Sequence, residues 1–109
     1  MFELTQGQVD SFQNDGYVFA QDMVDDATIE TVRQSYERMF RGEFATGVLP
    51  DEVNWQEGKS DPSLTRQICC GWKGDFDVAR TVLRSDIGRA CATLGGWPGA
   101  RVFVDNVLW

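Results

Sequence analysis

Histidine is absent from this 109-residue sequence. Histidine is the commonest protein ligand of transition metals and the commonest general base near neutral pH. Its absence excludes a Ser-His or Cys-His nucleophile, and it excludes a histidine-ligated metal site built from this chain alone. Carboxylates and thiols are the metal-binding side chains that remain in this chain.

Basic residues are also few, since ten Lys and Arg stand against seventeen Asp and Glu, for a formal net charge of −7. Nucleic acids and anionic membranes are bound through a basic surface. We therefore expect neither as a partner and interpret the acidity as an aid to solubility. No apolar run approaches the ~18 residues of a membrane span, and no basic and apolar leader opens the chain.

Cysteine is scarce as well, with three residues: Cys69, Cys70 and Cys91. An odd count without an export signal is typical of reduced thiols and predicts a cytoplasmic protein. The neighbours Cys69 and Cys70 lack the C-x-x-C spacing of zinc sites and would alternate across a strand. We expect all three thiols to lie in the core.

The chain begins with clear helix signals. Thr5 and Gln8 fit a capping box, and Gly16 fits the left-handed residue that closes a helix, so we expect a short helix between them. The β-forming residues 17–20 follow, and they predict a short strand.

Three further helices are predicted. The first starts after Asp25 and ends at Gly42, because its apolar residues recur at helical spacing and form one stripe that we expect in the core. That stripe is Ile29, Val32, Tyr36, Met39 and Phe40. The other two cover residues 76–83, with Leu83 on the buried edge, and residues 87–94, with Cys91 facing inward.

Residues 43–62 between these helices are predicted to form a long loop, and such loops often bind ligands. Trp55 in this loop either packs back onto the core or faces a ligand. A strand is predicted at residues 64–69, where Arg66 stands in line with two apolar residues. A buried arginine needs an anionic partner, whereas an arginine at a strand edge reaches water.

The last ten residues, ARVFVDNVLW, predict a long apolar strand in which Asn106 shares a face with Val102, Val104 and Leu108. A single amide in an apolar row needs a hydrogen-bond partner, which a ligand carboxylate, a buried water or a core group would supply. Because the other strands are short, the sequence predicts an α+β fold with an incomplete core sheet.

The segment LTQGQVDSFQNDGYVFAQDMVDDATIETVRQSYERMF resembles the opening of the phytanoyl-CoA dioxygenase family. TRQICCGWK, VLRSDIGRACATLGGWPGARV and DNVLW resemble later parts of the same front section, so the resemblance covers essentially the whole chain. It implies that residues 1–109 are the N-terminal part of a single domain. That part would be a helical shell with the first strands of a double-stranded β-helix, a jelly-roll or cupin-like fold.

Members of that family are Fe(II)- and 2-oxoglutarate-dependent oxygenases, and two histidines and one carboxylate hold their iron. The resemblance places these ligands after the last residue of this sequence, so we expect neither iron nor 2-oxoglutarate to bind this chain tightly by itself. It implies no catalytic residue and no metal ligand within this chain, and it implies cofactor-binding positions at Arg66 and Asn106. Trp55 and Trp72 would line the pocket for a small organic substrate.

Two functions follow from these observations. In the first, the chain is the front of an oxygenase that hydroxylates a small molecule. In the alternative, it is a non-catalytic remnant or interaction module, which pairs its C-terminal strand with a partner or with a second copy of itself.

Overall fold

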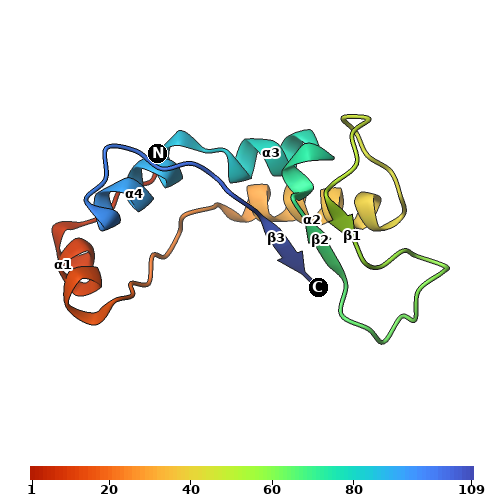
Figure 1. Ribbon diagram of the computed structural model, residues 1–109, viewed down its shortest axis with the longest axis horizontal. Coiled ribbons are helices and arrows are strands. Elements are labelled where there is room, and N and C mark those ends of the chain that lie inside the picture. The colour runs from red at the N-terminus through yellow and green to blue at the C-terminus, as the bar shows by residue number, and fades with distance from the viewer. The chain divides into compact units, whose positions relative to one another are not determined.

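The computed structural model describes all residues from Met1 to Trp109 and shows an α+β protein (Figure 1). In chain order the elements are α1 (Gln6–Asp15), α2 (Asp26–Phe40), β1 (Glu52–Val53), β2 (Gln67–Cys69), the 3₁₀ helix η1 (Gly71–Lys73), α3 (Phe76–Val82), α4 (Ser85–Gly95) and β3 (Asn106–Leu108). The predicted α+β class is confirmed. None of these helices has the length and apolar character needed to cross a membrane.

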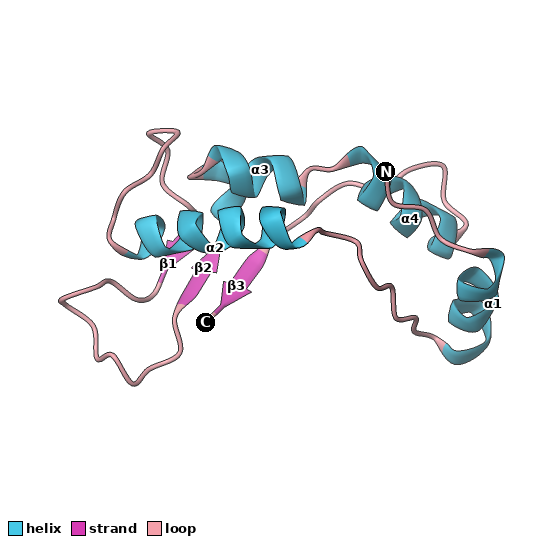
Figure 2. Cartoon of the chain, turned by 180° about the vertical axis from the view of Figure 1, so that it is seen from behind, coloured by secondary structure: helices cyan, strands magenta, loops and turns pink.

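The chain forms two compact units, and each is built from two separate stretches of sequence. The helical unit consists of Met1–Asp25 and Leu83–Val102 and contains α1 and α4. The sheet unit consists of Asp26–Val82 and Phe103–Trp109 and contains all three strands, with α2, η1 and α3. Figure 2 distinguishes the helices and strands of both units by colour.

Helix α1 begins and ends as predicted. The Gln8 backbone N–H donates to the Thr5 hydroxyl over 3.3 Å, and the Thr5 N–H donates to the Gln8 side chain over 2.9 Å. Gly16 closes the helix at a φ of 81°, where a side chain would be strained. These contacts satisfy donors that a helix end leaves without partners.

The strand predicted at residues 17–20 does not form. Tyr17 and Phe19 are both exposed, and their rings pack edge to face with 5.8 Å between centroids. The segment is held by the Gln8 side-chain amide, which donates to the Phe19 carbonyl over 3.3 Å. The prediction fails because β-forming side chains need a neighbouring strand, and no strand lies beside this segment.

The core of the sheet unit is built on the C-terminal half of α2. Tyr36, Met39 and Phe40 are buried, whereas Ile29 near the start of the helix is 52% exposed. The predicted stripe is therefore core over only part of its length. The other buried members of this core are Trp55, Ile68 and Val78.

The three strands form an antiparallel sheet in the order β1-β2-β3. Ile68 in the centre pairs with Val53 on one side and Val107 on the other. Ile68 is buried and Val107 packs partly buried against the α2 core, so this face of the sheet is covered. Gln67 and Asn106 alternate to the opposite face, which we call the open face.

Both long strands are shorter than predicted. β2 covers three of the residues 64–69, and β3 covers three of the last ten residues. Phe103, just before β3, is 95% exposed. A strand extends only as far as its partner pairs with it, so the short β2 limits β3. Residues 43–62 are likewise not all loop, because β1 lies among them.

The inward faces of the last two helices differ from the prediction. Cys91 is exposed and its neighbour Ala92 is buried, so α4 is turned relative to the expected core face. Leu83 lies beyond the end of α3 and is half exposed, whereas Val78 of α3 is fully buried.

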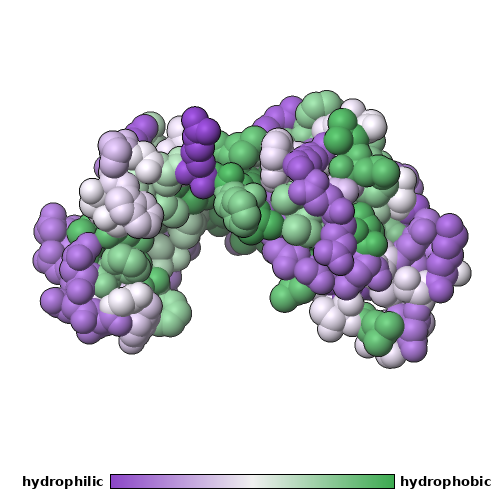
Figure 3. Space-filling view, in the orientation of Figure 1, coloured by the Kyte–Doolittle hydropathy of each residue, from purple (hydrophilic) through white to green (hydrophobic).

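Figure 3 shows that many apolar residues remain at the surface among hydrophilic ones.

Candidate functional site

The open face of the sheet carries a row of three side-chain amides, which we call the amide row: Asn54, Gln67 and Asn106. Asn54 Nδ2 donates to Gln67 Oε1 over 3.3 Å, and Gln67 Nε2 donates to Asn106 Oδ1 over 3.2 Å. The Gln67 backbone N–H donates to Asn54 Oδ1 over 2.7 Å. Each amide is therefore oriented by its neighbour, and Asn106 Nδ2 remains as the terminal donor.

Asn106 is exposed and is not the amide of a buried apolar row. The register places Val107 opposite the buried Ile68, so the predicted face of Val102, Val104 and Leu108 is not the one that packs on the core. Because strand side chains alternate, this register turns Asn106 outward. Its hydrogen-bond partner is the side-chain amide of the half-buried Gln67.

Arg66 lies near two aromatic rings on the covered face. Its guanidinium carbon is 3.8 Å from the centroid of the Trp55 ring and 5.9 Å from that of Phe40. A guanidinium over an aromatic face is attracted by the ring's quadrupole. Arg66 is half-buried and forms no ion pair, and its stacking on the Trp55 ring is a contact that neither predicted alternative included.

Trp55 packs back onto the core, which is one of its two predicted alternatives. It is 4% exposed, and its ring meets Phe40 edge to face with 5.9 Å between centroids. Its indole N–H donates to the Asp61 carbonyl over 2.8 Å. The buried indole therefore has its polar atom satisfied, as buried tryptophans usually do.

Trp72 lies in η1, partly buried against the core, with the Lys73 ammonium 5.9 Å from its ring centroid. The structure thus brings Trp55 and Arg66 together on the covered face. It leaves Asn106 on the open face and Trp72 in a separate element. The four predicted site residues do not converge on one place.

Asp105 is a residue that the sequence analysis did not single out. Its carboxylate accepts hydrogen bonds from the Gly71 N–H (3.2 Å), the Trp72 N–H (3.3 Å) and the Tyr36 hydroxyl (3.4 Å). Burial first, and then the Asp105 charge, raise the pKa of Tyr36 well above its ordinary value. Asp105 therefore connects the start of β3 to η1 and α2. The sequence feature that could have pointed to it is a single acidic residue in an otherwise apolar strand.

The adjacent cysteines lie close to an ion pair between Lys73 and Asp51, whose nitrogen and oxygen are 2.6 Å apart. The hydrogen bond to Asp51, then burial, then the neighbouring Cys69 raise the pKa of the Cys70 thiol to about 11. A thiol with so high a pKa is protonated at neutral pH and is a poor nucleophile. All three cysteines are free, but only Cys70 is buried as predicted.

Two other acids stabilise helix starts. Asp75 is buried and accepts hydrogen bonds from the N–H groups of Asp77 (2.9 Å) and Val78 (3.2 Å) at the first turn of α3. Asp86 in α4 accepts from the Phe2 N–H over 2.7 Å and pairs with Arg84 over 2.6 Å. Both carboxylates are held by these contacts, so we assign Asp75 and Asp86 a structural role at the starts of the two helices.

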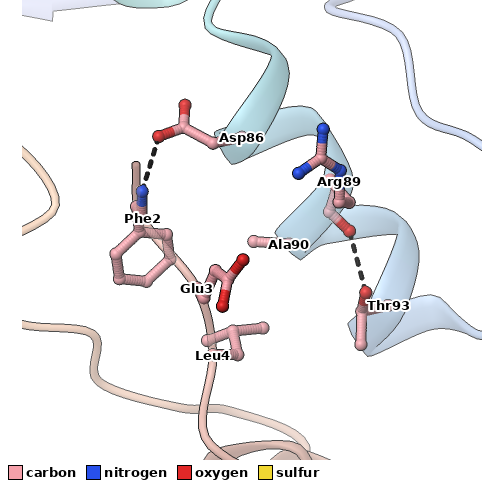
Figure 4. A pocket seen from close by; sticks show the side chains of 7 residues that line it. All are labelled: Phe2, Glu3, Leu4, Asp86, Arg89, Ala90 and Thr93. Atoms are coloured by element: carbon pink, nitrogen blue, oxygen red, sulfur yellow. Dashed lines mark hydrogen bonds between the residues drawn. The ribbon is translucent and has the colours of Figure 1, made fainter.

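Several pockets lie away from the predicted site residues, and two of them lie in different units of the chain. One, in the helical unit, has a volume of about 190 Å³ and lies between the N-terminal segment and α4 (Figure 4). The other, in the sheet unit, has a volume of about 390 Å³ and is lined mainly by apolar residues: Met39, Gly42, Phe44, Leu49, Pro50, Val53 and Gln56. No group of three or more Cys, Asp or Glu side chains is placed to hold a metal ion.

No protein-family model, curated protein or solved structure matches this chain.

Proposed function

We propose that this chain is the front part of an Fe(II)- and 2-oxoglutarate-dependent oxygenase of the phytanoyl-CoA dioxygenase type, which hydroxylates a small organic substrate. In this proposal the sheet unit supplies the first strands of a double-stranded β-helix. The other strands and the iron ligands come from outside these 109 residues. The observation that supports the proposal most is the sheet itself, which has one covered face and one open, polar face.

The two faces suit the two sides of a β-helix sheet. Such a fold packs two sheets face to face, so each sheet has an outer face and an inner face that lines the interior. Ile68 and Val107 pack toward α2, as an outer face covered by helices would. The amide row lies on the other face, where Asn106 Nδ2 would donate to a carboxylate oxygen of 2-oxoglutarate.

The same geometry separates the two cofactor-binding positions that the resemblance implies. Arg66 is stacked on Trp55 on the covered face, whereas Asn106 is on the open face. A ligand bound against the open face would reach Asn106 but not Arg66. We therefore propose a ligand contact for Asn106 and a packing role for Arg66 and Trp55.

The residues of this chain do not fit an iron site. The sequence has no histidine, and no suitable acid or thiol cluster is present. The proposed part of this chain is to form one wall of the pocket and to orient the co-substrate, with no chemical step on its own side chains. We place this function in the cytoplasm, because three unpaired thiols are usual in a reducing compartment.

The first test is to read the coding sequence beyond the codon for Trp109. A frame that soon encodes a His-x-Asp motif, with a second histidine further on, supports the proposal. A downstream frame without this motif overturns it for this chain.

The second test uses the protein that includes those residues and measures iron-dependent succinate formation. Asn106→Ala removes a hydrogen bond to a charged group, so the KM for 2-oxoglutarate should rise about tenfold. Arg66→Ala is the matched control on the covered face and should leave this KM unchanged. Equal effects of both variants would contradict the proposed division between the faces.

A further inference from the structure

Cys69 and Cys70 are neighbours at the end of β2, and the backbone changes direction between them. β2 ends at Cys69, and Cys70 adopts a left-handed conformation with φ 57° and ψ 45°. In a continuous strand the two side chains would point to opposite faces of the sheet. The left-handed residue breaks this alternation, and a hydrogen bond joins the two thiols. The structure therefore brings together two thiols that an extended strand would separate.

The thiol pair lies beside charged side chains at the surface of the sheet unit. The Cys70 thiol donates a hydrogen bond to the Asp51 carboxylate, which pairs with the Lys73 ammonium over 2.6 Å. The Asp51 side chain is 52% exposed and Cys69 is half-buried, so the pair lies directly beneath the surface. Both thiols are free. A small reagent from the solvent can therefore reach them.

A disulfide between these two residues is disfavoured by the backbone. The Cα atoms of neighbouring residues are about 3.8 Å apart, whereas those joined by a disulfide are usually about 4.4–6.8 Å apart. An arsenic atom spans a wider gap between two sulfurs than an S–S bond does. It therefore suits two thiols that are in hydrogen-bond contact.

We propose that Cys69 and Cys70 together bind trivalent arsenic compounds of the type R–As(OH)2. Two As–O bonds break and two As–S bonds form, and each hydroxide leaves as water with the proton of one thiol. The arsenic stays trivalent, so the step needs no oxidant or reductant. The product carries no charge, which suits the buried Cys70.

The order of the two bonds follows from exposure. Cys69 is the more exposed of the two thiols and reacts first. Cys70, which is a poor nucleophile, then reacts within the same molecule, where proximity compensates for its low reactivity. Cys91 is free and exposed but has no second thiol in the helical unit, so it forms only one bond to arsenic.

This proposal does not rest on the proposed function, because it needs neither iron nor 2-oxoglutarate. The experiment adds phenylarsonous acid to the reduced 109-residue chain in an excess of 2-mercaptoethanol. A monothiol displaces an arsenical held by one sulfur more readily than one held by two, because the second bond forms within the same molecule. One arsenical per chain should remain by mass spectrometry, and 1,2-ethanedithiol should remove it. No retained adduct, or an adduct that maps to Cys91, overturns the proposal.

Three cysteine variants test which thiols take part. Cys69→Ser and Cys70→Ser each leave one thiol of the pair and should weaken binding of phenylarsonous acid by roughly 100-fold. Cys91→Ser is the matched control and should bind as the unmodified chain does. Equal binding by all three variants overturns the proposal.

Thermal unfolding of the unmodified chain tests whether the folded state forms the site, and it needs no variant that has to fold. Neighbouring cysteines can also bind arsenic in an unfolded chain. A ligand that binds the folded state more tightly stabilises it, so phenylarsonous acid should raise the melting temperature. An unchanged or lowered melting temperature overturns the proposal, because the folded structure then does not favour binding.

Discussion

At the scale of single residues, partners decide what each charged side chain does. Arg66 has no carboxylate within ion-pairing distance and is held by the Trp55 and Phe40 rings. Asp105 has no basic partner and is held by two backbone N–H groups and a phenol. Both residues therefore act as packing and anchoring groups in this structure.

Asp105→Asn should destabilise the sheet unit by about 1–3 kcal/mol, because hydrogen bonds to a charged acceptor are replaced by weaker ones to a neutral amide. The measurement is the free energy of unfolding in urea. Tyr36→Phe removes only the longest of the three bonds and should cost less, about 0.5–1.5 kcal/mol. Equal stability of Asp105→Asn and the unmodified chain would show that the anchor contributes nothing.

Arg66→Ala should cost about 0.5–1 kcal/mol, the usual contribution of a cation over an aromatic ring at a partly exposed site. Arg66→Lys keeps the charge but loses the planar stacking, so it should recover only part of this loss. Urea unfolding followed by tryptophan fluorescence measures both variants. The variant Trp55→Phe identifies which part of the fluorescence comes from the Trp55 ring beneath the guanidinium. If Arg66→Lys recovers the full stability of the unmodified chain, planar stacking does not contribute.

At the scale of elements, α4 contains one glycine in its interior, Gly88, and one as its last residue, Gly95. An added Cβ at Gly88 meets nothing within 4 Å, whereas an added Cβ at Gly95 would lie 2.4 Å from the Trp97 ring. The two glycines of this helix therefore differ in the space around them. They provide a matched pair of substitutions.

Gly88→Ala should stabilise the helical unit by about 0.5–1 kcal/mol, because alanine loses less backbone entropy than glycine in a helix. Gly95→Ala should destabilise it or displace the exposed Trp97 ring. Thermal unfolding measures the first effect, and a changed Trp97 fluorescence signal reveals the second. A gain in stability at both positions, with the Trp97 signal unchanged, would contradict the crowding at Gly95.

The first turn of α4 predicts a dependence on pH. Hydrogen bonds from Arg84, followed by the Phe2 N–H, hold the pKa of Asp86 well below its ordinary value of 3.8. Because the pKa of Asp86 is lower in the folded state than in the unfolded state, its ionised carboxylate stabilises the folded state at a pH above the unfolded-state pKa. This stabilisation is lost as the pH falls toward the folded-state pKa. The melting temperature should therefore fall below about pH 4, and Asp86→Asn should remove part of this fall.

The control for this titration is Asp15→Asn, which changes an exposed aspartate that forms no ion pair. Asp15 lacks the Arg84 and Phe2 hydrogen bonds that Asp86 accepts, so Asp15→Asn should remove less of the fall in melting temperature than Asp86→Asn does. An equal effect of both variants would mean that the contacts of Asp86 do not link its protonation to folding.

At the scale of the whole molecule, the chain divides into two units that each combine distant stretches of sequence. Ile68 lies wholly inside the sheet unit and is completely buried. Ile68→Ala should therefore cost about 2–5 kcal/mol in that unit through the cavity it leaves. Hydrogen exchange should show faster opening of β2 and α2, with α4 unchanged.

Ala92→Gly is the reciprocal change, made in the buried face of α4 in the helical unit. It should weaken protection in α4 by about 0.5–1 kcal/mol and leave β2 unchanged. If either variant lowers protection equally in both units, the chain unfolds as one cooperative body and the division into units has no energetic meaning.

The sequence by itself determined the local features. The Thr5 and Gln8 cap, the Gly16 stop, the extent of α2 and the α+β class were all predictable. The groups that begin and end a helix lie within a few residues of one another, so their pattern is legible without the rest of the chain.

Only the tertiary structure decided the lengths of the strands, the outward turn of Asn106 and the exposure of Cys91. A strand exists only where a partner distant in sequence pairs with it, and a shift of one residue exchanges its two faces. The pairing of Ile68 with Val107 fixes the register of β3 and places Asn106 and Arg66 on opposite faces of the sheet. No local pattern contains that pairing, because it joins residues that are far apart along the chain.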